Sequence, residues 1–158
     1  MAALSRSRRS AAGIAFIVGG ALMLLGIILG YAAINFGNVI SFIGSYTSIG
    51  LKLGPDGTPL AYGGDTYPGL IRKSPIRQLR LFLQDGRNDL DNEHGNWFLA
   101  NQQMLKAFEW ANAHADAEKV AGPRYDVNHR WTEGAHSDAD GGAILPDVLR
   151  WIWRDQRP

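Results

Sequence analysis

The order of extended and helical segments between residues 79 and 153 limits the fold more than any other feature of this sequence. A strand-like run at 79–84 precedes a helical segment at 97–115, and a second strand-like run at 125–131 precedes a second helical segment at 144–153. Strands that alternate with helices pair in parallel, because each helix returns the chain to the same end of the sheet. The pattern therefore predicts an α/β fold with a mostly parallel sheet.

The helix predicted over 97–115 has a signal at each end. Asn96 stands in the N-cap position, and Gly122 with Pro123 stops the segment after a polar extension. Small and apolar residues recur at three- and four-residue steps on one face: Trp97, Ala100, Met104, Ala107 and Ala111. The helix predicted over 144–153 contains Pro146, which is tolerated in a first helical turn.

Shorter elements are expected upstream of these segments. Residues 38–44, NVISFIG, are β-branched and aromatic and end at glycine, which indicates a buried strand. The turn sequence GPDG at 54–57 separates two short extended runs and predicts a small hairpin, because proline fixes φ and glycine accepts a positive φ. Residues 67–75 are typical of irregular surface chain.

A long apolar run near the N-terminus, AAGIAFIVGGALMLLGIILGYAAI at 11–34, contains no charged residue. A helix of about 20 apolar residues crosses the hydrocarbon core of a bilayer. The run is longer than a signal-peptide core and has no clear cleavage site after it. We predict a transmembrane helix over 11–35 that contacts the lipid bilayer. A buried helix of a soluble protein is the alternative interpretation.

The charges around this run predict its orientation. Arg6, Arg8 and Arg9 precede it, and the next positive charge is Lys52. Because positive flanks stay in the cytoplasm, we predict a single-pass protein with a basic cytoplasmic tail, 1–10, and an extracytoplasmic domain, 36–158. A G-x-x-x-G pattern at 26–30 would let two such helices approach closely, which leaves self-association open.

Composition excludes several classes of function. The formal net charge is +1, and the basic residues form no patch beyond the N-terminal cluster, so no nucleic acid is expected as a partner. Cysteine is absent, which excludes disulfides and thiolate zinc sites. His94, His114 and His129 have no metal-ligand spacing. We therefore predict no metal and no cofactor.

A candidate acid and a candidate base follow the two strand-like runs. Asp85, Asp89 and Asp91 crowd the loop after the first run, and His136 lies a few residues after the second run. Active sites of open α/β sheets lie in the loops beyond the carboxyl ends of the strands. An acid followed by a histidine is also the chain order of α/β-hydrolases, although their G-x-S-x-G nucleophile motif does not occur here.

Other interpretations of the acidic loop remain at this point. Aspartates favour turns, and negative charge is favourable before a helix such as 97–115. A calcium loop is excluded, because counting from Asp89 places His94 where the EF-hand needs glycine and Ala100 where it needs glutamate. Spacing alone does not choose among the three aspartates.

Three segments of the chain closely resemble the enterochelin-esterase-like family of esterases, which are α/β-hydrolases. They are LFLQDGRNDLDNEHGNWFLANQQM at 81–104, WTEGAHSDADGGAILPDVLRWIWRD at 131–155, and NVISFIGSYTSI at 38–49 with YPGLIRKSPIRQLRLF at 67–82. Together they cover most of residues 38–158. The resemblance implies a three-layer α/β sandwich and hydrolysis of carboxylic esters by a Ser-His-Asp triad.

The resemblance also assigns roles to residues. The family's G-x-x-D pattern falls on Gly86 to Asp89, which makes Asp89 the triad acid ahead of Asp85 and Asp91. The G-x-H pattern falls on Gly134 to His136, which makes His136 the triad base. In such a triad the histidine takes the proton of the nucleophile, and the carboxylate holds its tautomer and stabilises the imidazolium.

The chain departs from the family pattern in two places. The hairpin around 54–57 lengthens one segment. In addition, the upstream strands, oxyanion loop and nucleophile elbow of the family have no counterpart, and only SAAGIAF at 10–16 is similar to the stretch after the elbow. Ser10 would then be the nucleophile, but Arg8 and Ala12 replace the two glycines that permit the strained elbow.

The predicted protein is the carboxyl-terminal part of such an esterase behind a membrane helix. It carries the acid and base for a small-molecule ester but has no evident nucleophile, so we expect it to be inactive alone. The alternative is a membrane-anchored non-catalytic remnant or binding module. A truncated or fused gene product is a further interpretation. An interior strand left at an open sheet edge would favour self-association.

Overall fold

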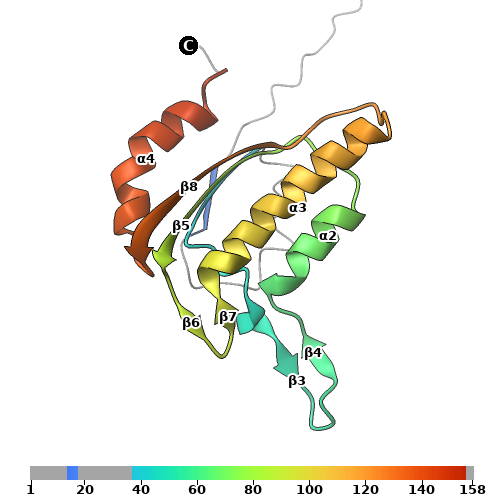
Figure 1. Ribbon diagram of the computed structural model, residues 1–158, viewed down its shortest axis with the longest axis vertical. Coiled ribbons are helices and arrows are strands. Elements are labelled where there is room, and N and C mark those ends of the chain that lie inside the picture. The colour runs from blue at the N-terminus through green and yellow to red at the C-terminus, as the bar shows by residue number, and fades with distance from the viewer. Residues whose placement is uncertain (1–13, 18–36, 156–158) are drawn as a thin grey trace, which may run out of the picture.

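The sheet predicted from the segment order forms the centre of the molecule. The computed structural model describes residues 14–17 and 37–155. Within these residues, four strands form one parallel sheet in the order β1-β2-β5-β8 (Figure 1). The strands are β1 Ile14–Ile17, β2 Asn38–Phe42, β5 Arg80–Asn88 and β8 Asp126–Ala135. The prediction of an α/β fold with a mostly parallel sheet is confirmed.

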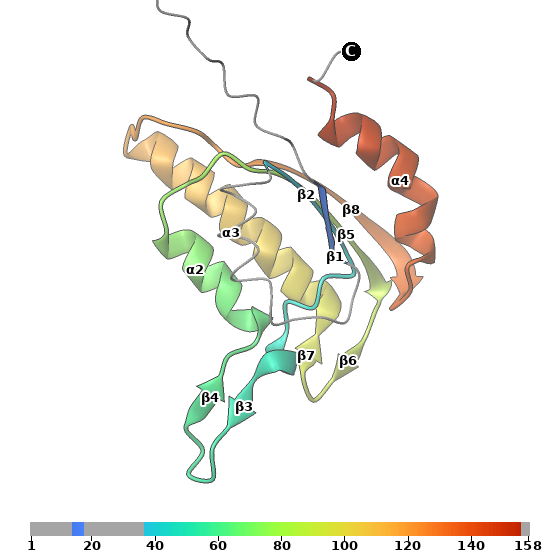
Figure 2. The same cartoon turned by 180° about the vertical axis from the view of Figure 1, so that it is seen from behind.

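Three α-helices in the described part of the chain cover the two faces of the sheet. Helices α2 (Tyr67–Lys73) and α3 (Trp97–Ala117) pack on one face, and α4 (Ala139–Ile152) packs on the other, as the two opposite views show (Figures 1 and 2). Strand order and helix placement therefore produce two separate apolar cores, one on each side of the sheet.

The alternation of side chains along the central strands supplies both cores. Val39, Leu81 and Leu83 pack with Met104 and Phe108 of the α3 side. On the α4 side, Ile40, Phe42, Phe82, Val148 and Ile152 form the second cluster. Strands buried on both faces read as continuous apolar runs, which explains the sequences of 38–44 and 79–84.

Two small hairpins extend from this layered body. Strands β3 (Lys52–Leu53) and β4 (Pro59–Ala61) pair antiparallel around Gly57, whose φ of 81° is the left-handed conformation that the turn sequence predicts. Strands β6 (Asp91–Asn92) and β7 (Gly95–Asn96) form a second hairpin before α3. Short 3₁₀ turns, η2 at Ser48–Gly50 and η3 at Gly64–Thr66, complete the connection from β2 to α2.

Two helices differ from the sequence predictions. Residues expected to be irregular form α2, because Ile71 is buried against the α3 side. Helix α4 begins five residues earlier than predicted, so Pro146 lies inside it and not in its first turn. The early start seats Gly141 against Phe42, where an added Cβ would lie 2.5 Å from the ring. By contrast, the Asn96 cap is confirmed, since its side chain accepts a hydrogen bond from Leu99 N at 2.9 Å.

Four residues of the predicted transmembrane segment fall in the described part of the chain. Ile14–Ile17 form β1 and pair in parallel with β2, so a strand stands here where a helix was predicted. Pairing of this β-prone stretch satisfies the backbone of β2, which would otherwise be an open sheet edge. In residues 14–17 and 37–155 we find no helix with the length and apolar character needed to cross a bilayer. The rest of 11–35, like the basic tail 1–10, lies outside the described residues.

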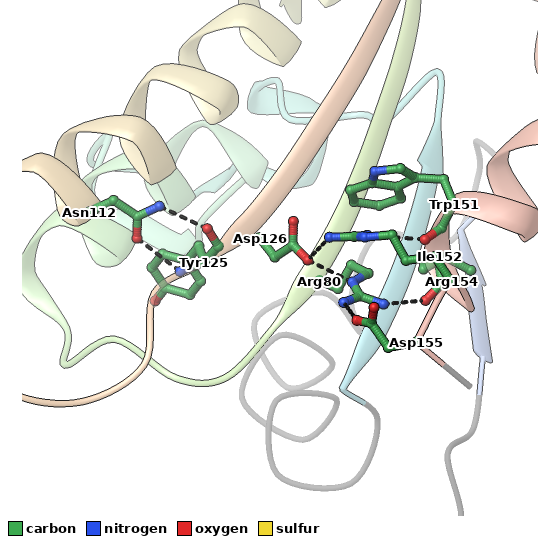
Figure 3. Close-up of polar contacts among 8 residues, drawn as sticks. All are labelled: Arg80, Asn112, Tyr125, Asp126, Trp151, Ile152, Arg154 and Asp155. Carbon is green, nitrogen blue, oxygen red and sulfur yellow. Dashed lines mark hydrogen bonds and ion pairs between the residues drawn. The ribbon is translucent and has the colours of Figure 1, made fainter. Parts of the chain in front are cut away.

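A polar network ties the helices to the starting ends of β5 and β8 (Figure 3). Arg80 donates to Asp126 Oδ2 at 2.7 Å and to the carbonyl of Ile152 at 2.8 Å, and it also pairs with Asp155. Arg154 pairs with Asp126 as well, and its guanidinium lies 4.6 Å from the ring centre of Trp151.

On the other face of the sheet, Asn112 of α3 exchanges two hydrogen bonds with the backbone of Tyr125. These contacts fix both faces at the end of the sheet opposite the loops that carry Asp89 and His136.

Candidate active site

The register of the sheet places Asp89 beside His136. Strands β5 and β8 run in parallel and point toward the same edge (Figure 1). Their last paired residues are Asn88 and Ala135, so the next residue of each strand is the candidate acid or the candidate base. His136 Nδ1 lies 2.7 Å from Asp89 Oδ1. Two residues that are 47 positions apart in sequence thus form one hydrogen-bonded pair.

The two members of the pair differ in their exposure to solvent. The Asp89 side chain is 0% exposed, whereas 29% of the His136 side chain is exposed. Asp89 Oδ1 also accepts the backbone N–H of Leu90 at 2.5 Å. An ionised carboxylate accepts hydrogen bonds but cannot donate them. The proton of the neutral imidazole therefore lies on Nδ1, and Nε2 has the free lone pair. The arrangement suits a histidine that accepts a proton at Nε2.

The glycines of the two sequence motifs permit this geometry. A Cβ on Gly86 would lie 2.1 Å from the carbonyl oxygen of Gly134. The register of β5 and β8 also shifts between Gly86 and Asn88, so the strands bend there. Close backbone contact at the bend requires glycine, which gives G-x-x-D and G-x-H a steric explanation.

Trp97 contributes a buried wall to the site. Its ring meets the His136 imidazole edge to face, with centroids 5.9 Å apart, and the residue is 1% exposed. Its Nε1–H donates to Ser45 Oγ at 3.1 Å. The indole is therefore held from both sides, and it restricts the rotation of the imidazole. The helical periodicity of 97–115 places Trp97 on the predicted helix, but no local sequence pattern links it to His136.

The other two aspartates of the loop have different surroundings. Asp91 is exposed in β6 and does not reach His136. Asp85 is 0% exposed and accepts hydrogen bonds from Gly86 N at 2.7 Å and Asn101 Nδ2 at 2.6 Å. Burial, followed by the adjacent Asp89 carboxylate, raises the pKa of Asp85 to about 8. Of the three candidate acids, the fold brings only Asp89 to the histidine within the described residues.

A nucleophile is not evident in the described part of the chain. Ser10 lies outside it. Within residues 14–17 and 37–155, no serine or threonine hydroxyl forms a hydrogen bond with His136, and the sequence contains no cysteine. The Ser45 hydroxyl accepts the Trp97 Nε1–H, and the Ser41 hydroxyl bonds to the Tyr46 hydroxyl. The same residues contain no cluster of ligands that could hold a metal ion.

An open cavity of about 520 Å³ lies near this edge of the sheet. The segment after β2, η3, the β6–β7 hairpin and the first turns of α3 line it, and Asp89 and His136 do not. The residues that face it are mostly polar, including Thr47, Ser48, Asp65, Asn92, Glu93, Asn96 and Gln103. Two of its lining residues, Gly95 and Asn96, immediately precede Trp97 in the chain.

The chain matches no family model, no curated protein and no solved structure. The resemblance to enterochelin-type esterases therefore stays a prediction from sequence. What the fold adds is geometric, namely the pairing of Asp89 with His136 and the burial of Asp85 and Trp97 around that pair.

Proposed function

We propose that Asp89 and His136 are the acid and base of a Ser-His-Asp hydrolase centre for carboxylic esters, built on the carboxyl-terminal part of an α/β-hydrolase sheet. The observation that carries this proposal is the 2.7 Å contact between His136 Nδ1 and the buried Asp89 carboxylate. In the reaction Nε2 takes the proton of a nucleophile hydroxyl, and Asp89 stabilises the imidazolium that forms. Trp97 keeps the imidazole in the orientation that this transfer needs.

The nucleophile of this centre comes from outside the described residues. Ser10 is the candidate within this sequence, and a hydroxyl from a second chain is the other source. A serine-directed fluorophosphonate tests both, because it labels an activated serine covalently. Labelling that disappears in Ser10→Ala assigns the nucleophile. Labelling that persists in Ser10→Ala removes Ser10 from the proposal.

Turnover of a small chromogenic ester by the full chain tests the acid and base. If the proposal is right, His136→Ala abolishes turnover, and Asp89→Asn lowers kcat by about 10⁴-fold because the wrong tautomer is favoured. Two exposed residues supply matched controls, His129→Ala on β8 and Asp91→Asn on β6, and both should leave the rate unchanged. Turnover that survives His136→Ala would contradict the proposal.

One observation favours a second function. Within the described residues no hydroxyl hydrogen-bonds to His136, so the fold is also compatible with a non-catalytic binding module. This alternative predicts no fluorophosphonate labelling, no ester turnover, and ligand binding that His136→Ala does not change. Ester cleavage that depends on His136 would exclude it.

Membrane attachment through 11–35 is a separate proposal that rests on the apolar run. Flotation of the full chain with phospholipid vesicles tests it, with Leu25→Lys as the variant that should lose binding. Pairing of β1 with β2 is the competing arrangement, because residues 14–17 cannot lie in the sheet and in the bilayer together. Protein that stays with the aqueous fraction would remove the membrane proposal.

A further inference from the structure

Two carboxyl groups lie together inside the candidate site. Asp85 is 0% exposed, and so is the side chain of Asp89, four residues further along the same strand end. Asp89 N donates to the Gly86 carbonyl at 3.1 Å, so the chain turns back at this strand end and brings the two carboxyl groups near each other. Asp89 Oδ1 is occupied by His136 and Leu90, whereas Asp89 Oδ2 is buried and has no donor among the described residues. A proton on Asp85 would supply the donor that Asp89 Oδ2 lacks.

The remaining contacts of Asp85 fix its position without neutralising it. Asn101 of α3 points its Nδ2 at three oxygens, those of Asp85, Gly44 and Trp97, at 2.6, 2.7 and 3.1 Å. This set of acceptors decides the orientation of the amide. Asn101 is neutral, and no lysine or arginine in the described residues pairs with Asp85 or Asp89.

Two buried carboxylates without a cation do not both ionise. Unit charges 4 Å apart repel by about 4 kcal/mol at an effective dielectric constant of 20, in addition to the cost of burial. Asp89 has the histidine as its partner, and Asp85 is the more deeply buried of the two residues. The shared proton therefore belongs on Asp85.

We propose that Asp85 is a neutral carboxylic acid in the native protein and donates its O–H to Asp89 Oδ2, which makes it a positioning residue for the Asp89–His136 pair. The bond leaves the negative charge on Asp89 and turns its other oxygen, Oδ1, toward the histidine. It also draws part of that charge away from His136. The catalytic meaning of this arrangement rests on the proposed function, but the protonation state of Asp85 does not.

The groups around Asp85 agree with this assignment. Asp89 faces it from the end of its own strand, and His136 acts on it through Asp89. Tyr46, from the segment after β2, is buried, and this burial raises its pKa to about 12, so it stays neutral. From β8, Thr132 Oγ1 lies 3.5 Å from the Asp85 carbonyl oxygen and donates to Asp140 of α4 at 2.7 Å. The raised pKa of Asp85, about 8, fits the same picture.

Carbon NMR of the full chain with ¹³C-labelled aspartate carboxyl groups tests the proposal directly. At pH 6.5 one aspartate signal should be that of a protonated acid, and it should titrate near pH 8. The signal should vanish in Asp85→Asn and persist in Asp65→Asn, an exposed aspartate that serves as the control. Ionised signals for every aspartate at pH 6.5 overturn the proposal, and so does a protonated signal that survives Asp85→Asn. The wild-type titration stands even if the variants do not fold.

The positioning role has its own readout in the imidazole of His136. Nitrogen NMR, with His136→Gln to assign the ring signals, reports the hydrogen bond at Nδ1 in each variant. Asp85→Ala removes the donor and should move the chemical shift of the Nδ1 signal, whereas Asp85→Asn keeps a donor and should leave it near the wild-type value. Equal values in the three proteins would end the positioning role. These measurements use no substrate, so absence of ester turnover alone counts against the proposed function only.

Discussion

The protonation of Asp85 makes the stability of the fold depend on pH in a defined direction. Its pKa is raised from 3.8 to about 8, so between these values the folded chain holds a proton that the unfolded chain has lost. The contribution of Asp85 to stability is therefore fully present below the unfolded pKa. It is lost as the pH rises from the unfolded pKa through the folded pKa. The slope for one proton is about 1.4 kcal/mol per pH unit.

The size of the effect follows from those two values. Between pH 5.5 and 7.5 the free energy of unfolding should fall by at most about 2.5 kcal/mol through Asp85 alone. Asp85→Asn cannot titrate, so this part of the pH dependence should be missing from the variant. Groups remote from Asp85 contribute equally to both proteins, so the difference between the two reports on Asp85 and its partner Asp89.

Urea denaturation followed by tryptophan fluorescence supplies the measurement, since the chain contains 5 tryptophans. The wild type, Asp85→Asn and the exposed control Asp65→Asn are compared at pH 5.5 and 7.5. The wild type and the control should lose stability together relative to Asp85→Asn. Three parallel changes would refute the reasoning, because they would mean that Asp85 carries no extra proton in the folded state.

Three further predictions concern the frame around the site, each measured as thermal unfolding of the full chain. Gly86→Ala should destabilise the fold by several kcal/mol, because its Cβ would lie 2.1 Å from a backbone oxygen, whereas Gly142→Ala has open space and should be neutral or stabilising. Equal melting temperatures for these two variants would contradict the steric explanation. Trp97→Phe should cost about 1–3 kcal/mol, since it leaves a buried hydroxyl without its donor; an unchanged stability would show that this bond contributes nothing. Arg80→Met should lower the melting temperature more than Arg150→Met, because the Arg80 side chain is 18% exposed and bonds to three groups, whereas the Arg150 side chain is 73% exposed and pairs with Asp147. The reverse order would refute the role given to the network.

The position of the acid–base pair could be predicted from sequence because it depends on simple features. Asp89 and His136 each follow an apolar run, and the carboxyl ends of two neighbouring parallel strands lie at the same end of the sheet. The burial of Asp85 could not be predicted in this way. Sequence places Asp85 in a polar loop, but β5 continues to Asn88 and draws it into the interior. One polar residue, Asn101, lies on the buried face of α3, and a polar residue in that position indicates that it has a buried polar partner. That partner is Asp85.

Other elements depend on long-range contacts that local patterns do not contain. Helix α2 has Pro68 and Gly69 in its first turn, and one buried residue, Ile71, decides that it packs as a helix. The early start of α4 depends on the fit of Gly141 against Phe42, two residues from opposite parts of the chain. At Ile14–Ile17, an apolar stretch suited to a membrane helix was equally suited to pairing with β2.

The Arg80 network also predicts how the molecule opens. It binds β5, β8 and α4 where the strands begin, whereas the far ends of β5 and β8 are joined by the Asp89–His136 hydrogen bond and by exposed contacts such as that of Asn88 with the Glu133 carbonyl. Local unfolding should therefore start at the loops after β5 and β8 and reach the Arg80 end last. Amide hydrogen exchange would then be slowest near Leu81 and Val127 and fastest around His136. Motions that admit a ligand to the acid–base pair would need no separation of the helices from the sheet.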